Sequence, residues 1–185
     1  MSTETIIISK TKAWIQDFII KLNICPFAAT VFNENKIAYR IIPDINNDHK
    51  EFLISSIEEL RSNSTIETSL LIFPGVYSDF FDYLKLIQLG EDCIHSGGYE
   101  GDYQFASFHP NYMFENSKPK DPENFSNRSP YPMLHLIREI SISEAIKHYG
   151  PTDDIPFNNI ANLKDIGFDK LNTAFQNNNW STLKK

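Results

Sequence analysis

The spacing of apolar side chains along the chain predicts an alternation of helices and strands. Several stretches carry apolar residues at helical intervals with polar residues between them, which is typical of helices that bury one face. Shorter runs rich in apolar residues are typical of strands in a buried sheet. We expect helices over residues 5–22, 48–62, 79–94, 130–148 and 158–165, a short helix from residue 26, and strands over residues 36–42, 68–73 and 103–108.

Two of these helices begin at residues that favour a helix N-terminus. Asp79 is placed to cap its helix with a side-chain oxygen. Ser129 and Pro130 stand at the start of the helix predicted over residues 130–148, where Ser caps free N–H groups and Pro fits the first turn. A long polar loop over residues 111–127 precedes this helix, and loops of this length are often functional.

The order of the elements predicts the fold class. Alternating strands and helices indicate right-handed crossovers, so we expect a three-layer α/β fold with a small, mostly parallel sheet flanked by helices. Residues 1–178 are expected to form one domain, followed by a flexible C-terminal tail over residues 179–185. Ligands of open parallel sheets bind at the carboxyl ends of the strands, and this rule places His109 at the functional edge.

Composition and charge narrow the class of partner. The 185 residues are 41% hydrophobic and carry a formal net charge of −7, which disfavours nucleic acid and anionic membrane surfaces. The two cysteines allow at most one disulfide, and the chain has no apolar run near the ~20 residues that span a bilayer. The N-terminus lacks the pattern of a secretory signal, so we expect a cytoplasmic protein of undefined oligomeric state.

The segment over residues 127–139 concentrates candidate binding groups. In the predicted helix, His135, Arg138 and Glu139 share one face. Arg128 stands just before the helix, where a guanidinium beside free N–H groups suits a carboxylate or phosphate. The alternative is structural: Arg138 and Glu139 make ion pairs, and Arg128 ties down the preceding loop.

Histidine and cysteine side chains offer three kinds of chemistry. His109, His135 and Glu139 have the residue types of a two-His, one-carboxylate metal site. Either His is also suited to general acid–base work, or to a hydrogen-bonded place in the core. Cys25 precedes a proline at a predicted helix start, where the helix dipole favours a thiolate nucleophile; the alternative is a packed thiol, and Cys93 is interpreted as packing.

Three motifs carry a resemblance to a known family. The segments LNICPFA (22–28), QFASFHPNYMF (104–114) and NRSPYPMLHLIRE (127–139) occur in this order, and with the DFFDY segment (79–83) they resemble the bacterial domain of unknown function 1415 over nearly the whole chain. The resemblance implies that Cys25, His109, Arg128 and His135 are shared with that family. It implies no activity, substrate or cofactor.

We therefore hold three functional hypotheses. The first is an enzyme, or a former enzyme, that acts on a small anionic metabolite at the carboxyl edge of the sheet, with Cys25, His109, His135 and Glu139 as catalytic candidates. The residues expected to bind its substrate are Arg40, Arg128, Arg138 and Tyr112. The second is a non-catalytic module that binds a ligand or protein through the aromatic loop around Tyr112. The third is a metal-dependent enzyme that uses His109, His135 and Glu139.

Overall fold

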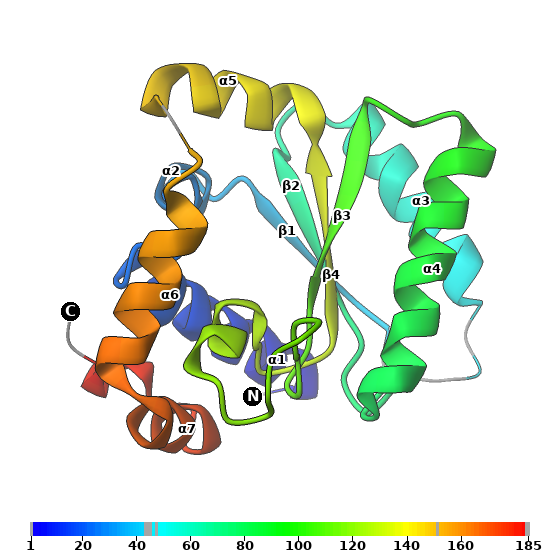
Figure 1. Cartoon of the computed structure of the whole chain (residues 1–185). Helices are drawn as coiled ribbons and strands as arrows, with labels where there is room; N and C mark the ends of the chain where they lie inside the picture. Colours follow the sequence, from blue (N-terminus) through cyan, green and yellow to red (C-terminus); the bar gives the residue numbers. More distant parts are fainter. Residues whose placement is uncertain (1, 43–45, 47, 151, 184–185) are drawn as a thin grey trace.

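The computed structural model describes residues 2–42, 46, 48–150 and 152–183 as helices packed on both faces of a four-stranded sheet (Figure 1). In chain order the elements are α1 (Thr3–Trp14), a π-helical turn (Ile15–Ile20), α2 (Ala28–Asn33), β1 (Ile37–Ile41), α3 (His49–Ser62), β2 (Thr68–Ile72), α4 (Phe80–Gly97), β3 (Tyr103–Phe108), a 3-10 turn (Pro122–Asn127), β4 (Met133–Arg138), α5 (Glu139–Tyr149), α6 (Ile155–Ile166), α7 (Phe168–Gln176) and a last 3-10 turn (Trp180–Thr182). Among the described residues, no helix has both the length and the apolar character needed to cross a membrane.

Capping residues set the ends of the two helices on one side of the sheet. The side chain of Asp48 accepts a hydrogen bond from the Glu51 N–H at 3.0 Å and begins α3. Asp79 begins α4 in the same way, as its sequence position predicted. Gly98, with a φ of 69°, then ends α4 in a left-handed conformation that costs glycine little.

The sheet is mixed, and the prediction of a mostly parallel sheet is wrong. Its strand order is β1-β2-β4-β3. Only the β1–β2 pair is parallel, because β4 lies between β2 and β3 and runs antiparallel to both. The three strands found from the sequence do run in one direction, but the fourth strand separates the second from the third.

The helix predicted over residues 130–148 is also wrong in its first half, because Met133–Arg138 forms β4. One local feature and one long-range feature oppose a helix here. Tyr131 precedes Pro132, and a residue before proline avoids helical backbone angles. The following apolar run fills the central gap of the sheet, where both neighbouring strands offer backbone hydrogen bonds. Only the second half of the predicted segment is helical, as α5.

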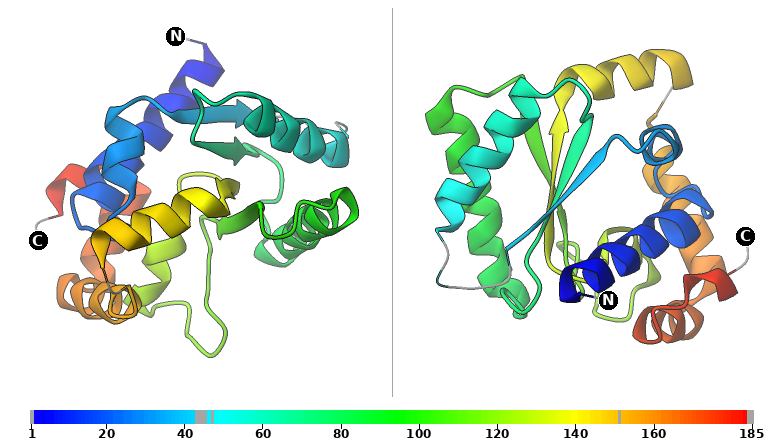
Figure 2. Two further views of the ribbon diagram at one scale, coloured as in Figure 1. Left: turned by 90° about the horizontal axis from the view of Figure 1, so that it is seen from above. Right: turned by 180° about the vertical axis from the view of Figure 1, so that it is seen from behind.

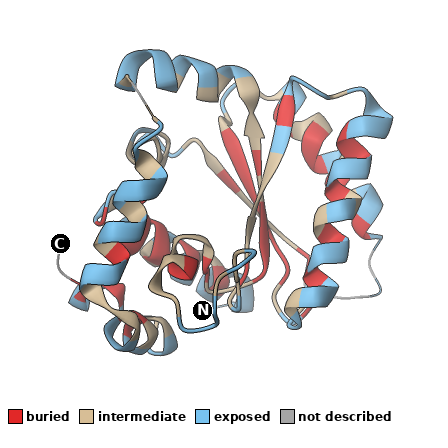
Figure 3. Cartoon of the chain, in the orientation of Figure 1, coloured by how far each residue is buried: buried red, intermediate tan, exposed pale blue. Residues whose placement is uncertain are grey.

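Two hydrophobic cores lie on the two faces of the sheet (Figures 2 and 3). Helices α3 and α4 cover one face, over side chains such as Leu71 and Leu134. The other face packs against α1 and the π-helical turn through Trp14, Phe18 and Ile72. Helices α2, α5, α6 and α7 lie further out on this second side, and the candidate site is found there.

The C-terminal segment differs from the loose tail expected after residue 178. Trp180 is 1% exposed and Leu183 is 3% exposed, and both belong to the core on the α1 side. Helix α7, which was not predicted, brings this segment back onto the domain. Lys184 and Lys185, the end of the expected tail, lie outside the described residues.

Candidate functional site

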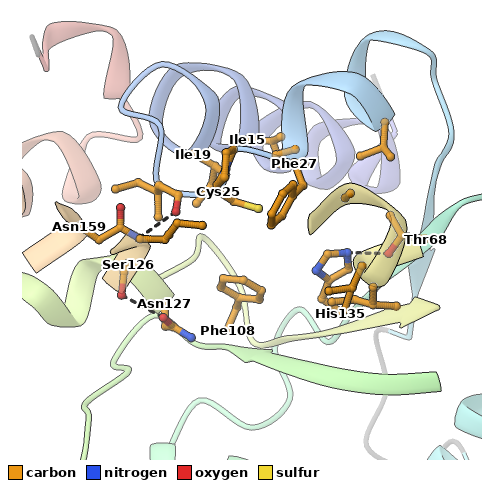
Figure 4. Close-up of a pocket in the computed structure, with 18 of the residues that line it drawn as sticks. Ile15, Ile19, Cys25, Phe27, Thr68, Phe108, Ser126, Asn127, His135 and Asn159 are labelled. Carbon is orange, nitrogen blue, oxygen red and sulfur yellow. Dashed lines mark hydrogen bonds between the residues drawn. The ribbon is translucent and has the colours of Figure 1, made fainter. Parts of the chain in front are cut away.

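A large cavity lies between the sheet and the helices of the α1 side. Its volume is about 1290 Å³, above the ~300–1,000 Å³ range of most small-molecule pockets. Strands β2, β3 and β4 form its floor, and segments from α1, α2, α5 and α6 form its walls and mouth. Figure 4 shows side chains from the N-terminal helices and from the strands facing each other across this space.

Most of the cavity wall is apolar. Alternation along a strand sends every second side chain to the same face, so Thr68 and Leu70 of β2 and His135 of β4 all face α1. Aromatic and aliphatic side chains complete the wall, and they include Trp14, Ile15, Ile19, Phe27, Leu70 and Phe108. Trp14 packs edge-on against Phe108 with ring centroids 5.3 Å apart, which fixes one end of the cavity.

His135 is the titratable group on the floor of the cavity, and its tautomer follows from its partners. The Oγ1 of Thr68 lies 2.6 Å from the backbone oxygen of Leu136 and 2.6 Å from Nε2 of His135. A carbonyl oxygen only accepts, so the single hydroxyl hydrogen of Thr68 is donated to Leu136. Thr68 then accepts from His135, which places the ring hydrogen on Nε2 and leaves a lone pair on Nδ1.

The second ring nitrogen of His135 is a free acceptor beside the cavity. No residue in the described part of the chain forms a hydrogen bond with this Nδ1. Burial lowers the pKa of His135 to about 4, because a charged ring loses its hydration there. The ring is therefore neutral at pH 7 and offers an apolar cavity one hydrogen-bond acceptor.

Cys25 also lines the cavity, but as a thiol. Its sulfur accepts hydrogen bonds from the backbone N–H groups of Phe27 and Ala28, which lower its pKa. Burial raises the pKa by more, so the net pKa of Cys25 lies above its ordinary value. The sequence-based expectation of a dipole-stabilised thiolate is thus not supported by the environment of this sulfur.

The lining of the cavity carries more carboxyl groups than cations. The carboxyl groups come from several loops and helices and are those of Glu34, Glu67, Glu115, Asp121, Glu123 and Glu144. Lys36 lies among them and is paired with Glu34 at 2.7 Å. No arginine of the described chain lines the cavity. Glu123 is also paired, with Lys164 at 3.4 Å, and the lining carboxyl groups without a printed cation partner disfavour an anion.

His109 lies outside the cavity, in a fully hydrogen-bonded position. Its side chain is 0% exposed, its Nε2 lies 2.8 Å from the Tyr77 backbone oxygen, and its Nδ1 accepts from the Asn111 N–H at 2.9 Å. Both nitrogens are used, and burial lowers the pKa of the ring. His109 therefore holds the start of the long loop and does not line the cavity.

Arg128 and Tyr112 form a second structural unit in that loop. Arg128 follows a 3-10 turn instead of preceding a helix, and its guanidinium donates to the backbone oxygens of Tyr112 and Pro119. It also lies 4.5 Å from the centroid of the Phe125 ring. Tyr112 packs its own ring against Phe114 with centroids 5.0 Å apart. The loop is thus tied down internally.

Arg138 and Arg40 form hydrogen bonds with α3 and its C-terminal end, on the face of the sheet opposite the cavity. Arg138 donates to the backbone oxygens of Leu60, Asn63 and Ile66, so it satisfies free carbonyl groups at the end of α3. Arg40 forms a two-pronged ion pair with Glu59 of the same helix. Both guanidinium groups are occupied by structural partners.

The eight candidate residues chosen from the sequence do not converge. Cys25 and His135 line the cavity, whereas the other six residues, Arg40, His109, Tyr112, Arg128, Arg138 and Glu139, do not. Glu139 begins α5, and the strand conformation of β4 turns His135 and Arg138 to opposite faces. Within the described ranges, no three His, Cys, Asp or Glu side chains are grouped closely enough to hold a metal ion. His109, His135 and Glu139 therefore do not form a ligand set.

Sequence reasoning missed the partners that give His135 its character. Thr68 and Phe108 entered the sequence analysis only as ends of predicted strands, and Trp14 only as part of the helix predicted over residues 5–22. A signal existed for β4, in Pro132 and the apolar run after it, and a strand there separates the side chain of His135 from that of Arg138. The pairing with Thr68 depends on which strands are neighbours, and no local pattern contains that information.

Comparison with known proteins identifies the family of this chain. Searches among curated proteins and among solved structures find no match. A family model described as "Protein of unknown function (DUF1415)" matches residues 6–173, which include most of α1, most of α7 and every element between them. The match agrees with the three motifs at residues 22–28, 104–114 and 127–139. The chain therefore belongs to the DUF1415 family of proteins of unknown function.

Proposed function

We propose that this protein binds an apolar small molecule in the cavity between the sheet and the α1 side. The observation that carries the proposal is the cavity itself, with a volume of about 1290 Å³ and mostly apolar walls. Apolar surface of this extent gains free energy when a ligand displaces water from it, at about 25 cal/mol per Å². Pockets whose surface is mainly apolar and which also carry polar groups are typical of small-molecule sites.

Helix α5 supports the proposal through its poor packing. None of its eleven residues is buried, although it carries the apolar residues Ile142, Ala145 and Tyr149 at the cavity. Tyr149 reaches across the mouth to Phe27, with ring centroids 5.6 Å apart. A bound molecule would give this helix the apolar contacts that the domain alone does not supply, and ligand binding would then stabilise the fold.

The same geometry favours a binding role over chemistry on a small anion. The arginines expected to bind an anion contact backbone oxygens or Glu59, and the lining of the cavity carries more carboxyl groups than cations. The Cys25 thiol has a raised pKa, and a neutral His135 with a pKa of about 4 is a weak base. These features support the non-catalytic alternative among the three hypotheses.

A fluorescence titration tests this proposal. The neutral probe N-phenyl-1-naphthylamine brightens in apolar surroundings, and we expect saturable binding to the wild-type protein. Ala145→Trp places a large side chain at the cavity and should weaken binding about tenfold or more, which corresponds to about 1.4 kcal/mol. Ala161→Trp is the matched control, because Ala161 is an exposed residue of α6 outside the cavity wall.

Two results would overturn the proposal. The first is no saturable binding of the probe by a folded wild-type protein. The second is equal loss of binding in the two variants, which would place the probe elsewhere on the surface. Thermal unfolding of both variants shows whether either substitution has merely unfolded the chain.

A further inference from the structure

Two histidines with similar bonding differ in one respect that bears on the ligand. His109 and His135 each carry the ring hydrogen on Nε2 and donate it to an oxygen, of Tyr77 and Thr68 respectively. The Nδ1 of His109 accepts from the Asn111 N–H, but in the described chain Nδ1 of His135 has no partner. His135 therefore presents an unused acceptor to an apolar cavity, in an orientation that Thr68 fixes.

We infer that the molecule bound in this cavity is neutral and largely apolar, and that it carries a hydroxyl or N–H group which donates a hydrogen bond to Nδ1 of His135. This inference rests on the proposed function and names the class of its ligand. Nδ1 of His135 has no donor among the described residues and belongs to a side chain that lines an apolar cavity, so a ligand that supplies the donor gains affinity over one that does not.

The charge of the cavity defines which ligands are rejected. A carboxylate brings only acceptor oxygens to His135, and no arginine in the described chain faces the cavity to neutralise it. Carboxyl groups that line the cavity, such as those of Glu67 and Glu144, add repulsion. Because the pKa of His135 is lowered to about 4, its ring does not become a cation that would attract an anion near neutral pH.

Three naphthalenes of nearly equal shape test the inference. 2-Naphthol carries a donor, 2-methoxynaphthalene has only an acceptor, and 2-naphthoate is an anion at pH 7. We expect calorimetric titration of the wild-type protein to show 2-naphthol binding about fivefold to tenfold more tightly than 2-methoxynaphthalene, the range of one net hydrogen bond. The affinity for 2-naphthoate should be lower than for either neutral compound.

Two variants test whether the preference for 2-naphthol over 2-methoxynaphthalene depends on Nδ1 of His135. His135→Gln keeps an amide that can bond Thr68 but removes the acceptor at the Nδ1 position, so the preference for 2-naphthol over 2-methoxynaphthalene should fall to less than about twofold. His135→Asn retains an acceptor near Nδ1 and should keep part of the preference. In the wild-type protein, the ¹⁵N resonance of His135 Nδ1 should shift on binding 2-naphthol and not on binding 2-methoxynaphthalene.

The outcomes separate the inference from the proposal beneath it. If none of the neutral naphthalenes or N-phenyl-1-naphthylamine binds, the proposed function fails. If the neutral compounds bind but 2-naphthol has no advantage, or if His135→Gln leaves that advantage unchanged, the assignment of the donor to His135 fails while the binding site stands. An Nδ1 resonance that is insensitive to 2-naphthol would overturn the inference without any variant.

Discussion

The buried His135 ring predicts a specific loss of stability in acid. Its pKa in the folded protein is about 4, compared with an ordinary value of 6.5. Between these values the unfolded chain binds a proton at residue 135 and the folded chain does not. The free energy of unfolding therefore falls as the pH drops through this window, and the contribution of the neutral ring is fully present above it.

The size of this effect follows from the two pKa values. A tenfold difference in a proton-binding constant corresponds to about 1.4 kcal/mol, so protonation of the unfolded chain removes at most about 3 kcal/mol, most of it by pH 4.5. His109, whose pKa is also lowered by burial, adds to the acid loss in the same direction. A comparison with a variant of His135 alone is therefore needed.

Urea unfolding at pH 7.5 and pH 4.5 measures the effect. The difference in unfolding free energy between these pH values should be about 2–3 kcal/mol larger for the wild-type protein than for His135→Gln. His148→Gln is the matched control, because His148 is an exposed residue on α5. A wild-type pH dependence that parallels that of His135→Gln to within about 0.5 kcal/mol would refute the account of a buried, neutral ring.

Three other predictions address the packing around the site. Iodoacetamide should label Cys25 more slowly at pH 7.5 than it labels an unfolded chain, because burial raises the pKa of the thiol; labelling at the unfolded rate would contradict this. Trp180→Ala should lower the unfolding free energy by about 3–5 kcal/mol in a urea titration, because Trp180 is a core residue. A loss below about 1 kcal/mol would mean that the C-terminal segment is not packed against the domain. Arg138→Met should lower the unfolding free energy by about 1–3 kcal/mol, because carbonyl groups at the end of α3 lose their hydrogen-bond donor. Arg61→Met, on the exposed surface, should lower it by less than about 1 kcal/mol. Equal losses in the two variants would argue against capping of α3 by Arg138.

Local sequence signals were sufficient where an element is determined by its own residues. Asp48 and Asp79 cap helices whose apolar faces have clear helical spacing, so α3 and α4 were predicted nearly to the residue. The strands β2 and β3 were likewise evident from short apolar runs. The class of fold, helices on both faces of a sheet, followed from this order.

The errors arose where long-range pairing decides the structure. The segment Met133–Arg138 has apolar spacing that suits either a helix or a strand, and the gap between β2 and β3 selects the strand. This one change separated His135 from Arg138 and Glu139 and removed the basis for a convergent polar cluster. It also placed β4 between β2 and β3, which the expected right-handed crossover would have made neighbours.

The candidate site was only half predictable for a related reason. His109 and His135 have the same residue type, and both stand in motifs of the family. The difference between them is the presence or absence of a single donor, the Asn111 N–H, at one ring nitrogen. The cavity itself is the space left between packed elements, so its volume and charge become visible only when all the elements are placed.

A crystal structure of the protein grown with 2-naphthol tests the central claim most directly. The account predicts density for the naphthalene between Phe108 and the N-terminal helices, with its oxygen at hydrogen-bond distance, about 2.7–3.0 Å, from Nδ1 of His135. A cavity that holds only water while the protein is saturated with 2-naphthol, or a naphthalene bound elsewhere on the chain, would contradict it.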